Sequence, residues 1–368
     1  MNAEFILALE QIEKEKGIAK DILIETIEAA LVSAYKRNFG SSQNVRVEID
    51  KESGDVKVFS QKKIVEDPDM DTEFGDYLEI SLEEAREKYG YKCEMGDIIE
   101  EEVTPRNFGR IAAQTAKQVV VQRIREAERE VIYGEYINRE SEVVTGTIAR
   151  ISKGMVYVSL GKTEGILGPS EQIPTETYDF GQRIKVYILE VKKTTKGPQI
   201  LLSRSHPGLV KRLFELEVPE IYEGTVQIKS VSREAGSRTK MAVWSVDENV
   251  DSIGSCVGPK GTRVKTIVDE LGGEKIDIIK YSDDPKEYIS SALSPSKVVS
   301  VEVNEDEKSA KVVVPDYQLS LAIGKEGQNA RLAAKLTGWK IDIKSESQLK
   351  EGEEMPETFE ETEATEEV

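Results

Sequence analysis

A repeat in the second half of the chain limits its possible folds more than any other feature. Residues 257–264 (VGPKGTRV) are followed by residues 268–278 (VDELGGEKIDI), and the same order returns in residues 323–330 (IGKEGQNA) and 334–343 (AKLTGWKIDI). The two copies differ by one inserted residue. Such self-similarity indicates that one structural unit occurs twice. The chain is therefore expected to contain two neighbouring copies of a small domain.

Each copy follows the same succession of secondary-structure signals, a short helical pattern and then two β-rich runs. Helices are expected at residues 209–216 and 287–293, and strands at residues 226–231, 240–246, 298–303 and 311–314. Each copy is predicted to be an α-β-β-α-loop-α-β unit of about 70 residues.

The loop in each copy is a tetrapeptide with glycine at both ends. The loops are Gly258-Pro259-Lys260-Gly261 and Gly324-Lys325-Glu326-Gly327, each between a short apolar helix and an amphipathic one. Glycine lets the backbone approach a sugar-phosphate chain, and the next helix presents free N–H groups to phosphate. This resembles the KH domain, whose G-x-x-G loop holds about four nucleotides of single-stranded nucleic acid. A lone loop of this kind is more often a helix cap with a tight turn, but two copies in one topological position favour binding.

Polar side chains on the helices after the loops are predicted to contact the same strand of RNA. They are Arg263, Lys265, Gln328, Asn329 and Arg331. The alternative for all five is a role as solvated helix charges and caps.

Between the repeat and the first third of the chain, five short alternating runs predict a small β-barrel. The runs cover residues 146–151, 155–160, 164–167, 183–191 and 199–202, as in a five-stranded oligonucleotide-binding barrel. The glycine pattern and the closing Leu-Leu-Ser resemble the S1 RNA-binding motif. That motif usually places aromatic residues where this chain has Lys153, Val156 and Gly168. Because stacking contributes about 1 to 3 kcal/mol per base, the barrel is expected to bind RNA weakly.

Candidate contact residues remain on this barrel. Tyr157 is the nearest aromatic residue, and its ring could equally belong to the core. Arg150, Lys153, Lys162 and Arg183 could follow phosphates, or could be ordinary charges at strand edges.

The first third of the chain predicts a mixed α/β domain with no chemistry of its own. Apolar periodicity gives a helix around residues 24–35 and a long helix that starts at residue 108, with strands at residues 45–49 and 56–59 and a short helix at residues 81–88. The segment shows no phosphate loop, metal-ligand cluster or nucleophile paired with a base. Its composition indicates an acidic interaction domain.

The charge of the chain is distributed unevenly. The net charge is −19, but residues 1–143 carry 20 basic against 32 acidic residues, while residues 144–203 carry 8 against 5. Residues 204–345 are nearly neutral, so a polyanion could meet the middle of the chain.

No apolar run approaches the ~18 residues of a membrane span, and the N-terminus does not read as a secretory signal. Two cysteines and one histidine argue against disulfide scaffolds and histidine metal sites, and a cytoplasmic protein is expected.

The order of these parts and several strings resemble one family. The strings are EKEKG from Glu13, SAYKRNF from Ser33, GRIAAQTAKQ from Gly109, SRSHPG from Ser203 and AIGKEGQNARLA from Ala322. Together they resemble the NusA family of bacterial transcription termination and antitermination factors. The resemblance implies a head, residues 1–134, that binds core RNA polymerase near the RNA exit channel. It implies an S1 barrel at 135–203 and KH domains at 204–281 and 282–345 that take nascent single-stranded RNA.

The same resemblance implies a factor that modulates pausing, intrinsic termination and antitermination, together with other antitermination factors. It implies no catalysis, cofactor, metal or membrane, and a monomer is expected. Two alternatives stay open at this point. S1 and KH modules also accompany phosphorolytic nucleases, and they occur in ribosome-associated RNA-binding proteins.

Two further predictions concern the head and the C-terminus. Arg110 and Lys117 lie two helical turns apart on one face of the long helix. Because the head of a NusA-like factor lies beside the RNA exit channel, the resemblance implies that both contact the phosphates of a nascent RNA hairpin. A basic row of this kind is otherwise a solvated face. Residues 346–368 carry one basic and ten acidic residues and are predicted to be a disordered acidic tail.

Overall fold

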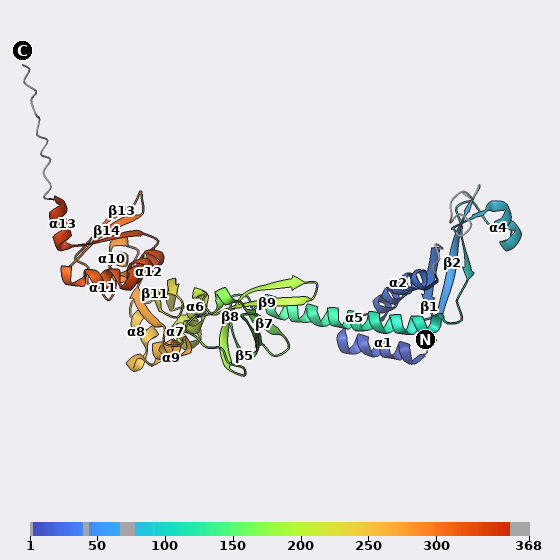
Figure 1. Ribbon diagram of the computed structural model, residues 1–368, viewed down its shortest axis with the longest axis horizontal. Helices are drawn as coiled ribbons and strands as arrows, with labels where there is room; N and C mark the ends of the chain where they lie inside the picture. Colours follow the sequence, from blue (N-terminus) through green and yellow to red (C-terminus); the bar gives the residue numbers. More distant parts are fainter. Residues whose placement is uncertain (1–2, 40–43, 67–77, 91, 354–368) are drawn as a thin grey trace, which may run out of the picture. The chain divides into compact units, whose positions relative to one another are not determined.

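The computed structural model describes residues 3–39, 44–66, 78–90 and 92–353 of the chain (Figure 1). The chain divides into two compact units, Met1–Tyr133 and Gly134–Val368. In the described residues, none of the helices has both the length and the apolar character that crossing a membrane requires.

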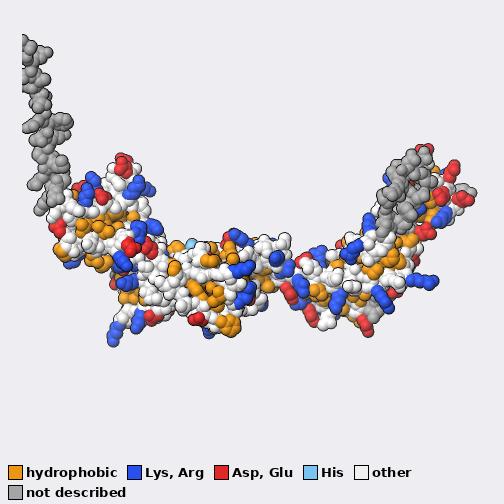
Figure 2. Space-filling view, in the orientation of Figure 1, with side chains coloured by type: hydrophobic (Ala, Val, Ile, Leu, Met, Phe, Trp, Pro, Cys, Tyr) orange, Lys and Arg blue, Asp and Glu red, His pale blue; other side chains and the backbone are white. Residues whose placement is uncertain are grey.

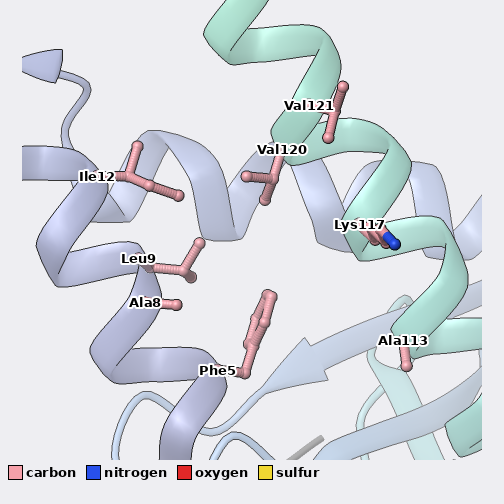
Figure 3. A pocket seen from close by; sticks show the side chains of 8 residues that line it. All are labelled: Phe5, Ala8, Leu9, Ile12, Ala113, Lys117, Val120 and Val121. Carbon is pink, nitrogen blue, oxygen red and sulfur yellow. The ribbon is translucent and has the colours of Figure 1, made fainter.

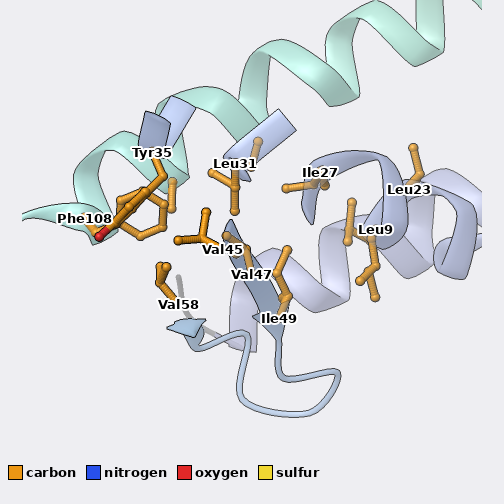
Figure 4. Packing of buried hydrophobic residues seen from close by; sticks show 13 residues of the cluster. Leu9, Leu23, Ile27, Leu31, Tyr35, Val45, Val47, Ile49, Val58 and Phe108 are labelled. Carbon is orange, nitrogen blue, oxygen red and sulfur yellow. The ribbon is translucent and has the colours of Figure 1, made fainter. Parts of the chain in front are cut away.

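The first unit is a head in which helices pack on a small sheet. Its elements are α1 (Ala3–Lys16), α2 (Lys20–Phe39), β1 (Asn44–Ile49), β2 (Val56–Val65), β3 (Glu79–Ser81), α4 (Leu82–Tyr89), β4 (Ile98–Glu102) and α5 (Phe108–Ile137), which runs on into the second unit. The sheet has the order β1-β2-β3, and β4 also pairs with β2. Buried side chains alternate along β1, and they meet the apolar faces of α1, α2 and α5 in one core (Figure 4). Within it, the Tyr35 and Phe108 rings meet edge-on at 5.8 Å.

The helices and strands predicted for the head are confirmed, but three elements were missed. The start of the chain reads as a run of charges, yet α1 buries Ile6 and Leu9. Strand β4 has the sequence IIEEE and a largely exposed surface, so it carries no alternating signal. Strand β3 is only three residues long.

The second unit begins with the predicted five-stranded barrel. Its strands are β5 (Val143–Ser152), β6 (Met155–Ser159), β7 (Glu164–Leu167), β8 (Arg183–Thr194) and β9 (Gly197–Ser203), closed in the order β5-β6-β7-β9-β8. The 3-10 turn η1 (Pro169–Glu171) follows β7. Inward-facing residues such as Ile148, Val158 and Ile188 are fully buried, which confirms the alternation expected from the sequence.

Two α/β domains with the same topology follow the barrel. The first contains α6 (Pro207–Glu217), α7 (Pro219–Tyr222), β10 (Val226–Glu234), β11 (Arg238–Ser245), α8 (Ser252–Val257), η2 (Pro259–Gly261), α9 (Thr262–Glu270) and β12 (Lys275–Lys280). The second contains α10 (Pro285–Ala292), β13 (Ser300–Asn304), β14 (Ser309–Val314), η3 (Asp316–Gln318), α11 (Leu319–Ile323), η4 (Lys325–Gly327), α12 (Gln328–Thr337) and β15 (Lys340–Ser345). Each sheet has one antiparallel pair and one parallel pair, and the parallel registers match, with Arg238 opposite Lys275 and Ser309 opposite Lys340. We call these domains KH1 and KH2 because both have the predicted α-β-β-α-loop-α-β order.

KH1 and KH2 share one apolar core. Ala242 and Ile279, on the sheet of KH1, are buried in the same cluster as Tyr288, Ile289 and Leu336 of KH2. The hydroxyl of Ser230 on β10 donates to the carbonyl of Leu336 on α12 at 2.8 Å. The two domains are therefore packed against each other by apolar and polar contacts.

The barrel is joined to KH1 by a buried arginine. Arg204 follows β9 and is only 3% exposed. Its guanidinium pairs with Glu176 of the barrel, and it donates to the carbonyl of Lys185 at 2.8 Å and to that of Glu270 on α9 at 2.9 Å. Because a buried guanidinium is stable only when its donors are satisfied, these contacts fix the barrel against KH1.

The C-terminal segment differs in part from the prediction. Residues Glu346–Glu353 form the helix α13, and Ser347 at its start donates from both its backbone N–H and its hydroxyl to Asp316. The expected disordered tail was placed from residue 346, because the segment has an acidic composition and no apolar period. The rest of that tail, from residue 354, lies outside the described residues.

Candidate nucleic-acid interface

The two G-x-x-G loops have the same backbone conformation. The first glycines, Gly258 and Gly324, have φ/ψ of 74°/173° and 75°/172°. The third residues, Lys260 and Glu326, have φ/ψ of 53°/25° and 53°/27°, in the left-handed region. Non-glycine residues in this region are strained by about 1 to 3 kcal/mol, and such strain persists where the surrounding structure imposes it. The repeat in the sequence is thus a repeat in loop geometry.

The first glycine of each loop is enclosed, whereas the second has open space around it in KH1 and Arg331 beside it in KH2. A Cβ on Gly324 would lie 2.8 Å from the backbone nitrogen of Asn329, and a Cβ on Gly258 would lie 2.7 Å from the Arg263 side chain. These first glycines are therefore required by packing. Around Gly261 the space is open, since a Cβ added there would meet no atom beyond its chain neighbours within 4 Å. The backbone there can be approached closely by an external chain.

A helix begins directly after each loop. Neither α9 nor α12 has a side-chain hydrogen bond at its N-cap, which is Gly261 or Gly327. The first N–H of each helix, on Thr262 or Gln328, donates to the carbonyl of Pro259 or Lys325 in the loop, and no side-chain cap covers the positive end of the helix dipole. This arrangement suits a phosphate group.

The predicted contact residues of KH1 are mostly accessible. Pro259, Lys260 and Lys265 are exposed. Arg263 is instead half-buried, because its guanidinium donates to Glu220 at 2.9 Å and to the carbonyl of Ser255 at 2.6 Å. Two lysines thus face solvent beside the KH1 loop.

The predicted contact residues of KH2 that lie on α12 already form hydrogen bonds with other groups of the protein. Lys325 and Glu326 are exposed, whereas Asn329 is 3% exposed and donates to the carbonyls of Leu293 and Ala322 at 3.1 and 3.0 Å. These bonds fix α12 to its own domain, so we leave Asn329 out of the proposed contact surface.

Gln328 and Arg331 of KH2 both reach into KH1. The amide of Gln328 donates to Glu234 at 2.9 Å, and the guanidinium of Arg331 forms an ion pair with the same carboxylate at 3.1 Å. Sequence reasoning could not find this link, because Glu234 belongs to the other copy of the repeat.

The barrel presents one aromatic residue whose face is already covered. Arg150 and Tyr157 are cross-strand partners on β5 and β6, and the guanidinium lies 3.4 Å from the centre of the ring. Glu164 on β7 accepts from Arg150 at 3.1 Å. Tyr157 is half-buried, so it is neither a core residue nor a free stacking platform.

The other predicted barrel residues lie at separate places. Lys153 is exposed in the β5–β6 hairpin with φ of 51°, Lys162 pairs with Glu135 at 3.3 Å, and Arg183 is exposed at the start of β8. One aromatic was missed. Phe180 precedes β8 and is 83% exposed, and the only signal for it in the sequence is a phenylalanine before a turn glycine.

The face of the second unit that is seen in Figure 2 carries no single basic patch. Its Lys and Arg side chains are interspersed with acidic and apolar ones. A polyanion on this face would therefore meet local groups rather than a broad positive field.

In the head, Arg110 and Lys117 are both exposed on α5, and neither forms an ion pair with another described residue. Lys117 also borders an apolar groove of about 360 Å³ between α1 and α5, into which Phe5, Leu9 and Val120 point (Figure 3).

The described part of the chain contains neither a group of metal ligands nor a disulfide. No group of three or more His, Cys, Asp or Glu residues could hold a metal ion there. Both cysteines are free, and burial raises the pKa of Cys256 to about 12.

Comparison with known families decides the identity of these domains. The NusA N-terminal domain matches residues 4–130, the S1 RNA binding domain 138–203, the NusA-like first KH domain 204–281 and the NusA-like second KH domain 285–351. This chain belongs to the NusA family.

Similarity to individual NusA proteins extends over almost the whole chain. The transcription termination/antitermination protein NusA of Halalkalibacterium halodurans is 61% identical over 351 residues, which are 95% of this chain and 90% of that protein. NusA of Bacillus subtilis is 61% identical over 353 residues, covering 95% and 93%. NusA of Mycobacterium tuberculosis is 46% identical over 350 residues, covering 92% of each. The function of the chain is thus transcription termination and antitermination, and its relatives are named as transcription factors rather than enzymes.

Proposed function

We propose that this NusA-family factor binds core RNA polymerase through residues 1–134 and nascent single-stranded RNA through residues 135–345. The observation that carries the RNA part is the identical left-handed geometry of the two loops, each followed by a helix N-terminus without a side-chain cap. In this proposal phosphates lie against the loop backbones and helix N-termini, and Lys260, Lys265 and Lys325 contact them from the side. The factor works in the cytoplasm as a monomer, and it acts with other antitermination factors.

The barrel contributes less to RNA binding than the KH loops. Tyr157 offers one covered ring face, while Lys153, Lys162 and Arg183 are too dispersed to form a single phosphate track. Their contribution is electrostatic and falls as salt screens it. Phe180, the exposed aromatic before β8, is an additional stacking candidate.

The experiment that tests the RNA proposal combines binding and polymerase association. The full chain and a Lys260→Ala/Lys265→Ala/Lys325→Ala variant would be titrated with a labelled single-stranded RNA, and each would be sedimented with core polymerase. We expect the variant to bind RNA about tenfold more weakly and polymerase equally well, because each lost phosphate contact removes counterion release. Equal RNA affinity for both proteins would contradict the proposal.

A second proposed contact lies in the head. Arg110 and Lys117 would meet the phosphates of a nascent RNA hairpin without reading its bases. Arg110→Ala/Lys117→Ala should shorten hairpin-dependent pauses and leave the binding of free RNA unchanged. Arg106→Ala, at an exposed arginine just before α5, is the control for the loss of one such charge outside this pair. If the double variant had unchanged pause lifetimes at low salt, with polymerase fully occupied, both residues would be ordinary solvated charges.

A further inference from the structure

One carboxylate of KH1 is bonded to the loop helix of KH2. Glu234 is the last residue of β10, and its Oε1 lies 3.1 Å from Arg331 Nη2. Its Oε2 accepts from Gln328 Nε2 at 2.9 Å, and Gln328 also donates to the hydroxyl of Ser237 at 2.7 Å. The first turn of α12 is therefore held by the β10–β11 hairpin of the preceding domain.

The guanidinium of Arg331 lies against the loop itself. Its Nη1 donates to the backbone carbonyl of Glu326, and a Cβ on Gly327 would lie 3.4 Å from the same nitrogen. One side chain thus connects the loop backbone with Glu234. A phosphate held at this loop would come within reach of the guanidinium, which binds carboxylate and phosphate oxygens with the same planar geometry.

KH1 has no such arrangement at its own loop. Lys265 is the counterpart of Arg331, since both stand four residues after the second glycine of the loop, and Lys265 is exposed with no ion pair to another described residue. Arg263 is paired, but with Glu220 of the same domain. Only the KH2 loop is therefore tied to a carboxylate from another domain, within the described part of the chain.

Glu234 is charged under physiological conditions. Burial alone would raise its pKa, but hydrogen bonds from Gln328 and Arg331 and the positive charges of Arg331 and Lys335 outweigh burial and hold the pKa below its ordinary value. The side chain of Glu234 is 27% exposed and that of Arg331 is 50% exposed, so the pair lies at the surface, where exchange with a dissolved anion is possible.

We propose that Glu234 occupies the position of an RNA phosphate beside the KH2 loop, so that RNA binds there by replacing this carboxylate at Arg331 and Gln328. The inference rests on the proposed function, in which the KH2 loop receives RNA. Glu234 thereby lowers the RNA affinity of the KH2 loop, whereas the carboxylate beside the KH1 loop, Glu220, belongs to KH1 itself. A carboxylate of KH1 thus sets how strongly the neighbouring domain holds RNA.

The test is Glu234→Gln in the full chain, titrated with an unstructured single-stranded RNA of about 12 nucleotides, enough for two loops that each hold about four. Removal of the competing charge should tighten binding about two- to fivefold, the range expected for a surface ion pair. Unchanged or weaker binding would overturn the inference.

Two further variants exclude trivial explanations. Glu220→Gln makes the same charge change at a pair inside KH1 and should leave RNA affinity unchanged; a similar gain there would show a general charge effect and refute the exchange. In an Arg331→Gln background, Glu234→Gln should give no gain, and a persisting gain would also refute it. Thermal unfolding would confirm that all variants are folded. Failure of the parent to bind the RNA at all would refute the proposed function instead.

Discussion

KH1 and KH2 have the same fold and loop geometry but different interiors. KH1 buries a network in which Arg233 and Glu274 pair at 2.9 Å with both side chains 0% exposed, and Thr239 donates to the same carboxylate at 2.5 Å. In KH2, Ala310 stands at the position of Thr239, and Trp339 stands at the position of Glu274, one residue before the parallel strand.

The lysines of the two sheets differ in the same way. Lys240 on β11 is fully buried and donates to Asp277 at 3.1 Å and to the carbonyl of Ser294 at 2.7 Å, whereas Lys311, its counterpart on β14, is exposed. KH1 packs against the barrel on one side and KH2 on the other, so its polar groups lose water and must find partners inside. KH1 and KH2 therefore share a backbone geometry because they have the same fold. They differ in buried polar groups because they pack against different domains.

The largest expected effect comes from breaking the network that only KH1 has. Glu274→Gln removes one charge of a buried pair and leaves Arg233 without compensation, which should lower the free energy of unfolding of KH1 by about 3 to 5 kcal/mol. The chain has two tryptophans, Trp244 in KH1 and Trp339 in KH2. Denaturant unfolding followed by fluorescence in a Trp339→Phe background therefore reports KH1.

The matched measurement uses the other tryptophan. In a Trp244→Phe background, Trp339 reports KH2, and its midpoint should move less than that of Trp244, since the buried pair lies in KH1. Equal shifts of both midpoints would show that the two domains unfold as one unit. The buried pair would then stabilise both domains rather than KH1 alone.

A smaller effect should separate the two loops in RNA binding. Pro259→Asp/Lys260→Asp changes the loop charge more than Lys325→Asp/Glu326→Asp does, because Glu326 is already acidic. We expect RNA affinity to fall about tenfold for the KH1 pair and about threefold for the KH2 pair, with a weaker salt dependence in both. Aspartate tolerates the left-handed conformation, so the loops should keep their geometry.

Lys308→Asp is the control for these loop variants. Lys308 is another non-glycine residue with positive φ, 46°, in the hairpin between β13 and β14 and outside both loops. It makes the same reversal of charge as Lys260→Asp alone, in a similar conformation, and should leave RNA affinity nearly unchanged. If the two loop pairs and this control all lost affinity equally, the loops would be structural turns and net charge would explain the binding.

The smallest effect is a dependence of KH1 stability on alkaline pH. Burial raises the pKa of Cys256 to about 12, while an unfolded thiol ionises near 8.5. The unfolded state therefore loses its proton first, and stability falls as pH rises through this window, by about 1 kcal/mol from pH 8.5 to 9.5. Cys256→Ala introduces the residue that KH2 has at the matching position, Ala322, and should abolish this part of the pH dependence. A variant with the parent's full pH dependence would contradict the assignment.

Much of this architecture could be predicted from the sequence because it depends on local patterns. The barrel strands alternate in the sequence as they do in the structure, and the repeat together with its glycine spacing gives the position of the two loops. Elements without such patterns were missed. The acidic strand β4 and the charged helix α1 are held by contacts with distant segments, which a local reading cannot supply.

The candidate site was predictable in position but not in the state of its side chains. Arg263, Arg331 and Lys265 look alike in the sequence, yet the first is bonded within KH1, the second is bonded to the other domain, and the third faces solvent. Their partners, Glu220 and Glu234, are 43 and 97 residues away along the chain. Only tertiary packing brings these groups together, within KH1 for the first pair and between KH1 and KH2 for the second.

The shared core of the KH domains has a consequence for synthesis of the chain. Ala242 and Ile279 are completed by side chains of KH2, which reach the ribosome's exit only after KH1 is finished. At a translation rate of roughly 5 to 20 residues per second, the residues of KH2 take several seconds to appear. During that interval the outer face of the KH1 sheet is an uncovered apolar surface on a growing polypeptide. The order of the two copies means that KH1 is synthesised before the side chains that cover its sheet, and a pause in translation between them would prolong the exposure of that surface.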